Sequence, residues 1–222
     1  MSATMIGEAA VAPRQAPVPR GLVHNLDEGK FESACAALMY QVLEDYRPDL
    51  IVGIRTGGFV VAEAMAHAAP HTIPVMPLTC RRASTGVKSR LKLLPTILAA
   101  LPRPAVDCLR WGEHHLLTAR RRTQTKVQHV DHAEATEIGR RLTQGSQSSG
   151  AMSSRVLVVD DAVDSGVTLA TVLRLLRESS PADTQFRSAV VTVTLAQPLA
   201  EPDYVLYRGI LCRFPWSFDA AG

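Results

Sequence analysis

The sequence has few cysteines and no long apolar run, and both absences restrict the class of protein. Its four cysteines, Cys35, Cys80, Cys108 and Cys212, form no CxxC pair, which argues against a zinc site or a disulfide framework and favours reduced thiols. No stretch reaches the ~18 apolar residues of a membrane-spanning helix. The N-terminal residues lack a charged start followed by an apolar run, so no secretory signal is predicted. We expect a cytoplasmic protein without a membrane partner.

A strong charge of one sign is lacking as well. The formal net charge is +3 and the isoelectric point is about 8.8. This mild basic excess suits an anionic small molecule, and it is too weak to indicate nucleic acid as a partner. With 222 residues, of which 46% are hydrophobic, the chain is long enough for one domain with a sizeable core and an added lobe.

Apolar runs alternate with stretches whose apolar residues recur at helical spacing. The runs are apolar throughout, which is typical of strands in a parallel sheet that helices cover on both faces. The sequence therefore predicts an α/β fold in which ligands bind at the carboxyl ends of the strands. Strands are predicted at 50–54, 73–80, 156–159 and 188–196, and helices at 29–46, at 59–68 and directly after the loop 164–168.

Other segments lack this alternation. Residues 1–22 are rich in alanine and proline and are predicted to form a flexible arm. Residues 81–154 are predicted as an inserted helical and flexible segment that ends in a polar linker at 145–154. The insertion carries basic clusters at 81–92 and 120–126. These clusters either fold over a bound anion, form a solvated basic face, or contact RNA or another partner.

Two adjacent carboxylates follow the apolar run VLVV, and a third comes shortly after them. Asp160 and Asp161 can accept hydrogen bonds from vicinal hydroxyls, and the turn Asp164–Thr168 opens onto a helix. Gly166 lets the turn bend tightly, and amides at a helix N-terminus bind phosphate. A phosphate beside a diol describes a ribose 5-phosphate. The alternative is that a residue of the turn only caps the helix, but capping leaves the adjacent carboxylates unexplained.

A second glycine-containing loop, Arg55–Gly58, follows another predicted strand in the stretch IVGIRTGG. Its amides and its arginine can hold a second anionic group. A Gly-Gly turn alone is weak evidence. It gains weight from the first loop, because both loops lie at the same edge of the predicted sheet.

These motifs resemble those of a known family. VLVVDDAVDSGVT closely resembles the phosphoribosyl-pyrophosphate signature of the type I phosphoribosyltransferases, and IVGIRTGG is similar to their pyrophosphate loop. The resemblance implies a Rossmann-like core within 23–222 and a C-terminal hood at 195–222. It implies transfer of ribose 5-phosphate from phosphoribosyl pyrophosphate to a nucleobase, with Mg²⁺ as the cofactor. We also expect a homodimer or a larger homo-oligomer.

The resemblance assigns roles to individual residues. Asp160 and Asp161 would hold the ribose hydroxyls and the metal. The 5-phosphate would be held by Asp164, Ser165, Gly166, Val167 and Thr168, and the pyrophosphate by Arg55, Thr56, Gly57 and Gly58.

The acceptor base is predicted from Asp164. Members of the family that act on 6-oxopurines usually carry aspartate at this position, near N7 of the purine, whereas members that use adenine, uracil or orotate usually carry a non-acidic residue. A carboxylate beside the base can take the proton released as the base nitrogen attacks the anomeric carbon. We therefore expect a purine-salvage enzyme in which Asp164 is the catalytic residue.

The tail QPLAEPDYVLYRGILCRFPWSFD resembles the hood of bacterial and archaeal xanthine/guanine phosphoribosyltransferases. Two positions depart from that pattern. The lysine that would recognise the 6-oxo group is Gln197, and the aromatic that would stack on the base aligns with Leu211, next to Cys212. These three are the candidate base-binding residues, and the departures leave the acceptor open. The alternatives are a phosphoribosyl-pyrophosphate-binding regulator without transferase activity and a transferase with a non-purine acceptor.

Overall fold

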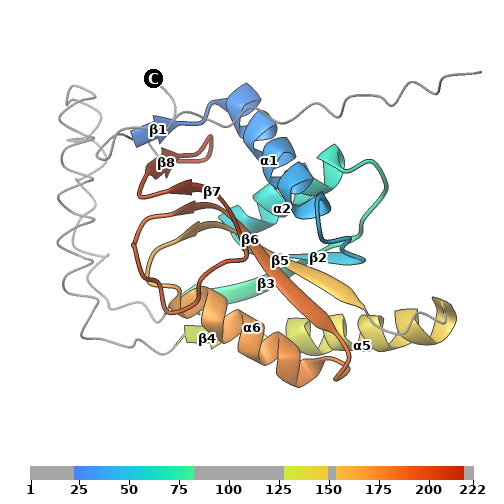
Figure 1. Ribbon diagram of the computed structural model, residues 1–222. Coiled ribbons are helices and arrows are strands. Elements are labelled where there is room, and N and C mark those ends of the chain that lie inside the picture. Colours follow the sequence, from blue (N-terminus) through green and yellow to red (C-terminus); the bar gives the residue numbers. More distant parts are fainter. Residues whose placement is uncertain (1–22, 83–127, 150–153, 218–222) are drawn as a thin grey trace, which may run out of the picture.

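The computed structural model describes residues 23–82, 128–149 and 154–217. Strands and helices alternate along them (Figure 1). The elements are, in chain order, β1 (Val23–Asn25), α1 (Glu28–Leu43), β2 (Leu50–Arg55), α2 (Gly57–Ala68), β3 (Val75–Arg82), β4 (Gln128–Val130), α5 (His132–Ser149), β5 (Arg155–Val163), α6 (Val167–Ser179), β6 (Gln185–Val193), β7 (Tyr204–Arg208) and β8 (Leu211–Arg213).

Most of the strands form one six-stranded sheet with the order β4-β3-β2-β5-β6-β7. Neighbouring strands are parallel except for β3 and β4, which are antiparallel. The predicted α/β fold with a parallel sheet is therefore confirmed.

Helices cover both faces of this sheet. α1 and α2 lie on one face, and α5 and α6 lie on the other (Figure 1). Neighbouring strand residues contribute to different sides: Ile51 and Leu157 pack in the cluster with α1 and α2, whereas Val52 and Val158 pack in the cluster with α5 and α6. Because each face is buried, these strands need apolar side chains at successive positions, which explains their continuous apolar runs.

Helix α5 lies inside the predicted insertion and is part of the core. Asp131 caps it, since Oδ1 of Asp131 accepts hydrogen bonds from the backbone N–H groups of Ala133 (2.9 Å) and Glu134 (3.1 Å). The Glu134 carboxylate accepts hydrogen bonds from the backbone N–H of Thr79 at 2.5 Å and from its hydroxyl at 3.2 Å. These contacts tie the start of α5 to β3.

The predicted polar linker was wrong over residues 145–149, because α5 continues to Ser149. The buried side chains of Ala135, Ile138 and Leu142 lie at helical spacing on its sheet-facing side. That packing holds the helix in place although its last turns are rich in glycine, serine and glutamine.

A second, two-stranded sheet forms the hood. In it β1 and β8 pair in parallel, with Val23 opposite Leu211 and Asn25 opposite Arg213. The backbone N–H of Leu26 extends this contact by donating to the carbonyl of Arg213 at 2.9 Å. The hood predicted from the tail alone therefore includes a strand that precedes α1, and β7 and β8 were also missed by the sequence analysis.

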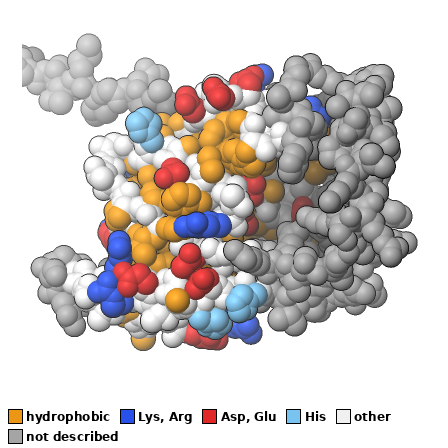
Figure 2. Space-filling view, turned by 180° about the vertical axis from the view of Figure 1, so that it is seen from behind, with side chains coloured by type: hydrophobic (Ala, Val, Ile, Leu, Met, Phe, Trp, Pro, Cys, Tyr) orange, Lys and Arg blue, Asp and Glu red, His pale blue; other side chains and the backbone are white. Residues whose placement is uncertain are grey.

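The remaining expectations have mixed outcomes. The strands predicted at 50–54, 73–80, 156–159 and 188–196 are confirmed in position, although their ends differ. The helix predicted from residue 59 begins at Gly57. The predicted arm and most of the basic segment lie outside the described residues. Within the described residues, no helix is long and apolar enough to cross a membrane. On the face turned away in Figure 1, acidic and basic side chains are interspersed (Figure 2).

Candidate active site

β2 and β5 are neighbouring parallel strands, and the chain leaves their carboxyl ends toward opposite edges of the sheet. From β2 the chain passes through α2 to β3 on one side, and from β5 it passes through α6 to β6 on the other side. α2 and α6 lie on opposite faces (Figure 1). Ligands of open α/β sheets bind at such a switch point. The loops Arg55–Gly58 and Asp160–Thr168 both lie there, as the sequence predicts.

The two loops contact each other through glycine. A methyl group added to Gly57 would lie 2.0 Å from Oδ2 of Asp161, and one added to Gly58 would lie 2.7 Å from Cα of Asp160. These separations are far below van der Waals contact, so a side chain at position 57 would displace the Asp161 carboxylate, and one at position 58 would displace the backbone at the end of β5. The glycines therefore let the N-terminus of α2 approach both carboxylates directly.

Asp160 and Asp161 lie where β5 leaves the apolar core. Asp160 is buried, with 9% of its surface exposed, and its Oδ1 accepts a hydrogen bond from the backbone N–H of Asp161 at 2.9 Å. Oδ1 of Asp161 accepts one from the backbone N–H of Ala162 at 3.0 Å. Burial raises the pKa of the Asp161 carboxyl above its usual value, and the nearby charge of Asp164 also raises it. A cation or donor hydroxyls would stabilise the charged form of this carboxylate.

The turn between β5 and α6 depends on Gly166. Gly166 is the N-cap of α6, and its φ of 75° and ψ of 0° place it in the left-handed region that glycine adopts readily. A Cβ at this position would lie 2.6 Å from the backbone nitrogen of Ala200. Because the N-cap is neither Asp164 nor Ser165, the capping alternative does not account for these residues. The first amides of α6 and the helix dipole favour an anion at this end.

The β6–β7 connection braces the same turn. The backbone N–H of Leu199 donates to the carbonyl of Ser165 at 2.8 Å, and Ala200 lies against Gly166. The loop that carries Gln197 is thereby joined to the loop predicted to hold the phosphate.

Asp164 receives a hydroxyl hydrogen bond from the neighbouring strand. Oγ1 of Thr194 donates to Oδ1 of Asp164 at 2.7 Å. Val163 pairs with Val193 at the ends of β5 and β6, so Asp164 and Thr194 are the next residues beyond that pair. The sequence analysis missed Thr194. Its place just past the end of a predicted strand, at the edge where ligands bind, is the feature by which it could have been found.

Arg55 and Thr56 complete the second loop. Arg55 is exposed at the end of β2, and its guanidinium carbon lies 5.9 Å from the centroid of the Phe59 ring. The peptide bond between Arg55 and Thr56 is cis. Thr56 is the N-cap of α2 and makes no side-chain capping hydrogen bond. The carboxyl ends of β2 and β5 are therefore followed by two helix N-termini, those of α2 and α6, and both favour anionic groups.

Residues 115–221 match the model of the phosphoribosyl transferase domain. The chain is therefore similar to this domain over slightly less than half of its length. The matched range contains β5, α6 and the hood strand β8, and the sheet extends the domain backwards through β3 and β2. The motifs at the ends of β2 and β5 and the fold of the sheet agree with this match. No curated protein is significantly similar to it in sequence.

Solved phosphoribosyltransferases share the fold of this domain. The purine phosphoribosyltransferase from Pyrococcus horikoshii is 19% identical with a TM-score of 0.53, over 87% of this chain and 93% of that one. The xanthine-guanine-hypoxanthine phosphoribosyltransferase from Helicobacter pylori is 16% identical with a TM-score of 0.55, over 89% and 96%. A hypothetical protein from Neisseria gonorrhoeae with bound ppGpp is 15% identical with a TM-score of 0.50, over 88% and 90%.

The candidate base-binding residues of the transferase domain differ in their surroundings. Gln197 is exposed in the β6–β7 loop. Leu211 and Cys212 are neighbours on β8, so their side chains point to opposite faces of the hood. Cys212 packs against the core cluster that contains α1, and burial raises the pKa of its thiol to about 12. Leu211 therefore points away from that cluster.

The PDY motif of the tail ties the start of β7 to β6 and to the segment that follows α1. Oδ2 of Asp203 accepts hydrogen bonds from both the backbone N–H and the hydroxyl of Ser188, each at 2.8 Å. The hydroxyl of Tyr204 donates to Oδ1 of Asp45 at 2.5 Å. These contacts give the motif a structural role that the sequence alone did not assign.

The tail also packs on α1 of the transferase domain through aromatic rings. Trp216 stacks on Phe214 with ring centroids 4.9 Å apart and meets the ring of Phe31 edge-on at 5.2 Å. Trp216 still exposes 40% of its surface. It is therefore a packing residue at the margin of the core.

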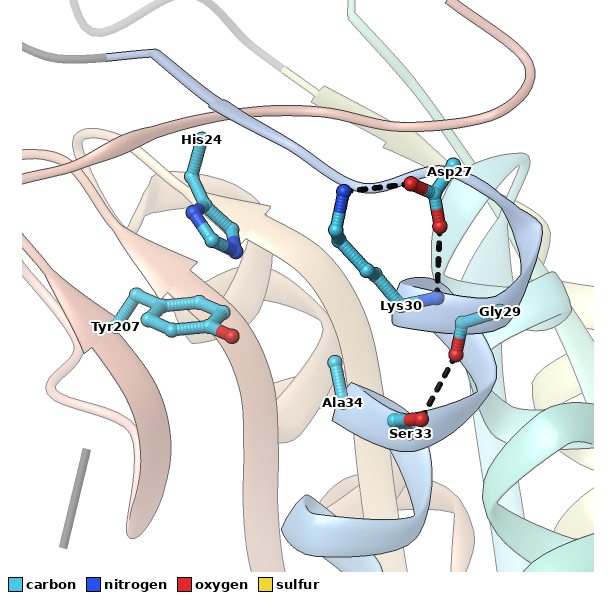
Figure 3. A pocket seen from close by; sticks show the side chains of 7 residues that line it. All are labelled: His24, Asp27, Gly29, Lys30, Ser33, Ala34 and Tyr207. Atoms are coloured by element: carbon cyan, nitrogen blue, oxygen red, sulfur yellow. Dashed lines mark hydrogen bonds and ion pairs between the residues drawn. The ribbon is translucent and has the colours of Figure 1, made fainter.

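A cavity of about 460 Å³ lies between α1 and the hood (Figure 3). Asp27 and Lys30 form an ion pair of 2.6 Å on one side of it, and the rings of His24 and Tyr207 lie 5.0 Å apart on the other side. Burial lowers the pKa of His24, and the charge of Lys30 lowers it further. The lining includes no predicted site residue, so this cavity is distinct from the predicted site at the carboxyl ends of β2 and β5.

Proposed function

We propose that the protein transfers ribose 5-phosphate from phosphoribosyl pyrophosphate to a 6-oxopurine and releases pyrophosphate. The observation that carries this proposal is the direct contact between the two motif loops, in which Gly57 meets Asp161. The contact joins a predicted pyrophosphate loop to a predicted ribose and 5-phosphate loop at one edge of the sheet. The pyrophosphate, the ribose and the 5-phosphate of phosphoribosyl pyrophosphate are thereby each assigned to residues that lie next to one another.

The 5-phosphate is assigned to the turn Asp164–Thr168. Gly166, with its positive φ, lets the backbone turn into α6, and the helix N-terminus favours a dianion through its amides and dipole. Asp160 and Asp161 are assigned to the two ribose hydroxyls, because an ionised carboxylate accepts hydrogen bonds from vicinal hydroxyl groups.

The pyrophosphate is assigned to Arg55–Gly58 at the N-terminus of α2. The donor set beside it fits Mg²⁺: Asp160 and Asp161 offer hard oxygen ligands, and Mg²⁺ binds through one or two carboxylates together with waters and phosphate oxygens. Within the described residues no group of three or more metal-ligating side chains gathers, which agrees with an ion that takes its remaining ligands from substrate and water. When bound, Mg²⁺ supplies charge that stabilises the departing pyrophosphate.

In the proposed reaction a base nitrogen bonds to the anomeric carbon while the bond from that carbon to pyrophosphate breaks. The transition state is oxocarbenium-like, so the chain contributes positioning and charge stabilisation. The proton released by the base passes to the carboxylate of Asp164. The hydrogen bond from Thr194 to Asp164 supports this role, since it fixes the carboxylate beside the phosphate turn.

The choice of a 6-oxopurine is supported by Asp164 and by two structural relatives, a purine and a xanthine-guanine-hypoxanthine phosphoribosyltransferase. Gln197 can donate a hydrogen bond to a 6-oxo group, and Leu211, which points away from the α1 cluster, can cover a face of the base. Cys212 faces that cluster and contributes to packing.

An acceptor panel tests the proposal. Purified protein is given phosphoribosyl pyrophosphate and Mg²⁺ with hypoxanthine, guanine, xanthine, adenine, uracil or orotate, and nucleotide formation is followed together with pyrophosphate release. We expect the highest kcat/KM with one of the three 6-oxopurines. Turnover confined to another base would reject the purine assignment. Binding of phosphoribosyl pyrophosphate without turnover of any base would identify a regulator that uses the same site.

A further inference from the structure

We propose that Thr194 is a positioning residue that orients the Asp164 carboxylate toward the acceptor base. This inference rests on the proposed function, because it takes Asp164 as the proton acceptor. Thr194 acts through Asp164 and is assigned no direct chemical step.

The hydrogen bond between the two residues is short and its donor is held in place. Oγ1 of Thr194 lies 2.7 Å from Oδ1 of Asp164, and the backbone N–H of Thr194 donates to the carbonyl of Val163 at 3.0 Å. Threonine is branched at Cβ, which limits its χ1 rotamers. Both side chains are half-buried. The backbone of Thr194, which follows β6, is therefore held against the end of β5, and this fixes the hydroxyl beside Asp164.

Asp164 needs such support because it lies in the turn after β5 and not in a regular element. A hydrogen bond from a hydroxyl to an ionised carboxylate is charge-assisted and stronger than one between neutral groups. Proton transfer requires the acceptor within hydrogen-bond reach of the proton, and a misplacement of about 1 Å can cost ~100-fold in rate. The Thr194 hydroxyl limits that misplacement while substrates enter and leave.

The same contact couples the phosphate turn to the loop that carries Gln197. Thr194 lies at the start of the β6–β7 connection and bonds to Asp164, and further along that connection Leu199 bonds to Ser165 at 2.8 Å. Gln197, the predicted base-recognition residue, therefore lies in sequence between two residues that bond to the turn containing Asp164. A base bound by Gln197 would therefore have a defined position relative to the Asp164 carboxylate.

The test compares Thr194→Val, which removes the hydroxyl at nearly constant volume, with Thr194→Ser, which keeps it. With the best acceptor from the panel, Thr194→Val should lower kcat by at least ~10-fold, because general acid–base catalysis contributes about 100- to 10,000-fold. KM for phosphoribosyl pyrophosphate should change by less than ~3-fold, since the contacts to phosphate remain. Thr194→Ser should recover most of kcat.

A double-variant cycle separates positioning from a general loss of structure. If Thr194 acts through Asp164, adding Thr194→Val to Asp164→Asn should lower kcat by less than ~2-fold beyond Asp164→Asn alone. Thr171→Val is the matched control, because the Thr171 hydroxyl donates to the carbonyl of Val167 within α6, at 2.8 Å, and not to Asp164. It should leave kcat unchanged.

Each outcome decides the inference. Equal kcat in the wild type and Thr194→Val, or additive losses in the double variant, would overturn the role of Thr194 while leaving the proposed function standing. Failure of Thr194→Ser to recover activity would also overturn it. Absence of turnover in the wild type with every base would instead reject the proposed function.

Discussion

Gly57 and Asp161 approach each other so closely that a single methyl group on the glycine would overlap the carboxylate, at 2.0 Å from Oδ2. One residue begins helix α2 and the other lies near the end of strand β5. The absence of a side chain at Gly57 therefore permits the close approach of the two predicted substrate-binding loops.

Replacing Gly57 with alanine should disable the site without unfolding the core. The new methyl group must displace Asp161 or the start of α2, so we expect binding of phosphoribosyl pyrophosphate to weaken by at least ~10-fold, or about 1.4 kcal/mol. Isothermal titration calorimetry measures this affinity. Gly145→Ala in α5 is the control, since no atom lies within 4 Å of a Cβ there. It should keep full affinity and stabilise the helix by ~0.5–1 kcal/mol. Equal affinity in the two variants would contradict the role of Gly57.

Replacing Asp161 with asparagine should stabilise the ligand-free protein while it abolishes substrate binding. The pKa of Asp161 is raised above its usual value of 3.8 by burial. The native state therefore holds this proton more tightly than the unfolded state, and stability falls as the pH rises from that value through the raised one. At pH 7 Asp161→Asn should be more stable by ~0.5–2 kcal/mol.

Urea unfolding at pH 3 and at pH 7 measures this difference. The gain of Asp161→Asn should shrink at pH 3, where both proteins carry a neutral side chain at position 161. An equal gain at both pH values would show that the stabilisation does not come from the charge. A gain at pH 7 with full retention of substrate affinity would argue against a ribose or metal role for Asp161.

Removing the hydroxyl of Tyr204 should weaken the contact between β7 and the segment that follows α1. That hydroxyl donates to Asp45 at 2.5 Å, and a hydrogen bond to a charged group is worth ~1.5–3 kcal/mol. Because Asp45 is exposed to solvent, this hydrogen bond contributes less than that range. We therefore expect Tyr204→Phe to lower the free energy of unfolding by ~1 kcal/mol. Tyr40→Phe is the matched control, since Tyr40 is 58% exposed, and it should change stability by less than ~0.5 kcal/mol. Chemical denaturation of both variants decides between these outcomes.

Replacing Gln197 with lysine tests base recognition. If this position faces the 6-oxo group, a charged donor should raise kcat/KM for guanine or xanthine by ~3- to 10-fold relative to adenine, because charge-assisted hydrogen bonds are the stronger ones. Gln41→Lys on the exposed side of α1 adds the same charge away from the predicted site and should leave the preference unchanged. A change in Gln197→Lys that is equal for all bases would indicate a general electrostatic effect and not recognition.

The sequence predicted the central sheet well because each central strand is buried on two faces. A run such as VLVV is favourable only in a strand that is buried on both faces. Because these strands are parallel, the loops that follow them lie at the same edge of the sheet. Arg55–Gly58 and Asp160–Thr168 were brought together by that argument alone, and the structure places them in contact.

Contacts between elements distant in sequence were not predictable in the same way. β1 has only three residues, and its partner β8 comes near the other end of the described chain, so no local pattern marks either strand. The predicted linker was wrong over residues 145–149, because the packing of Ile138 and Leu142 holds α5 against the sheet and the composition of these residues does not show this. Thr194 was missed because it lies beside Asp164 only through the register between β5 and β6, and the sequence does not show that register.

The pairing of β1 with β8 has a consequence for how the chain acquires its form during synthesis. β1 emerges from the ribosome early and has no strand partner until Leu211–Arg213 have been made. The sheet from β2 to β6 can assemble before that point, but the hood is completed only when the last strand arrives. A chain that stops short of β8 would therefore contain both predicted substrate-binding loops and still leave β1 without its strand partner.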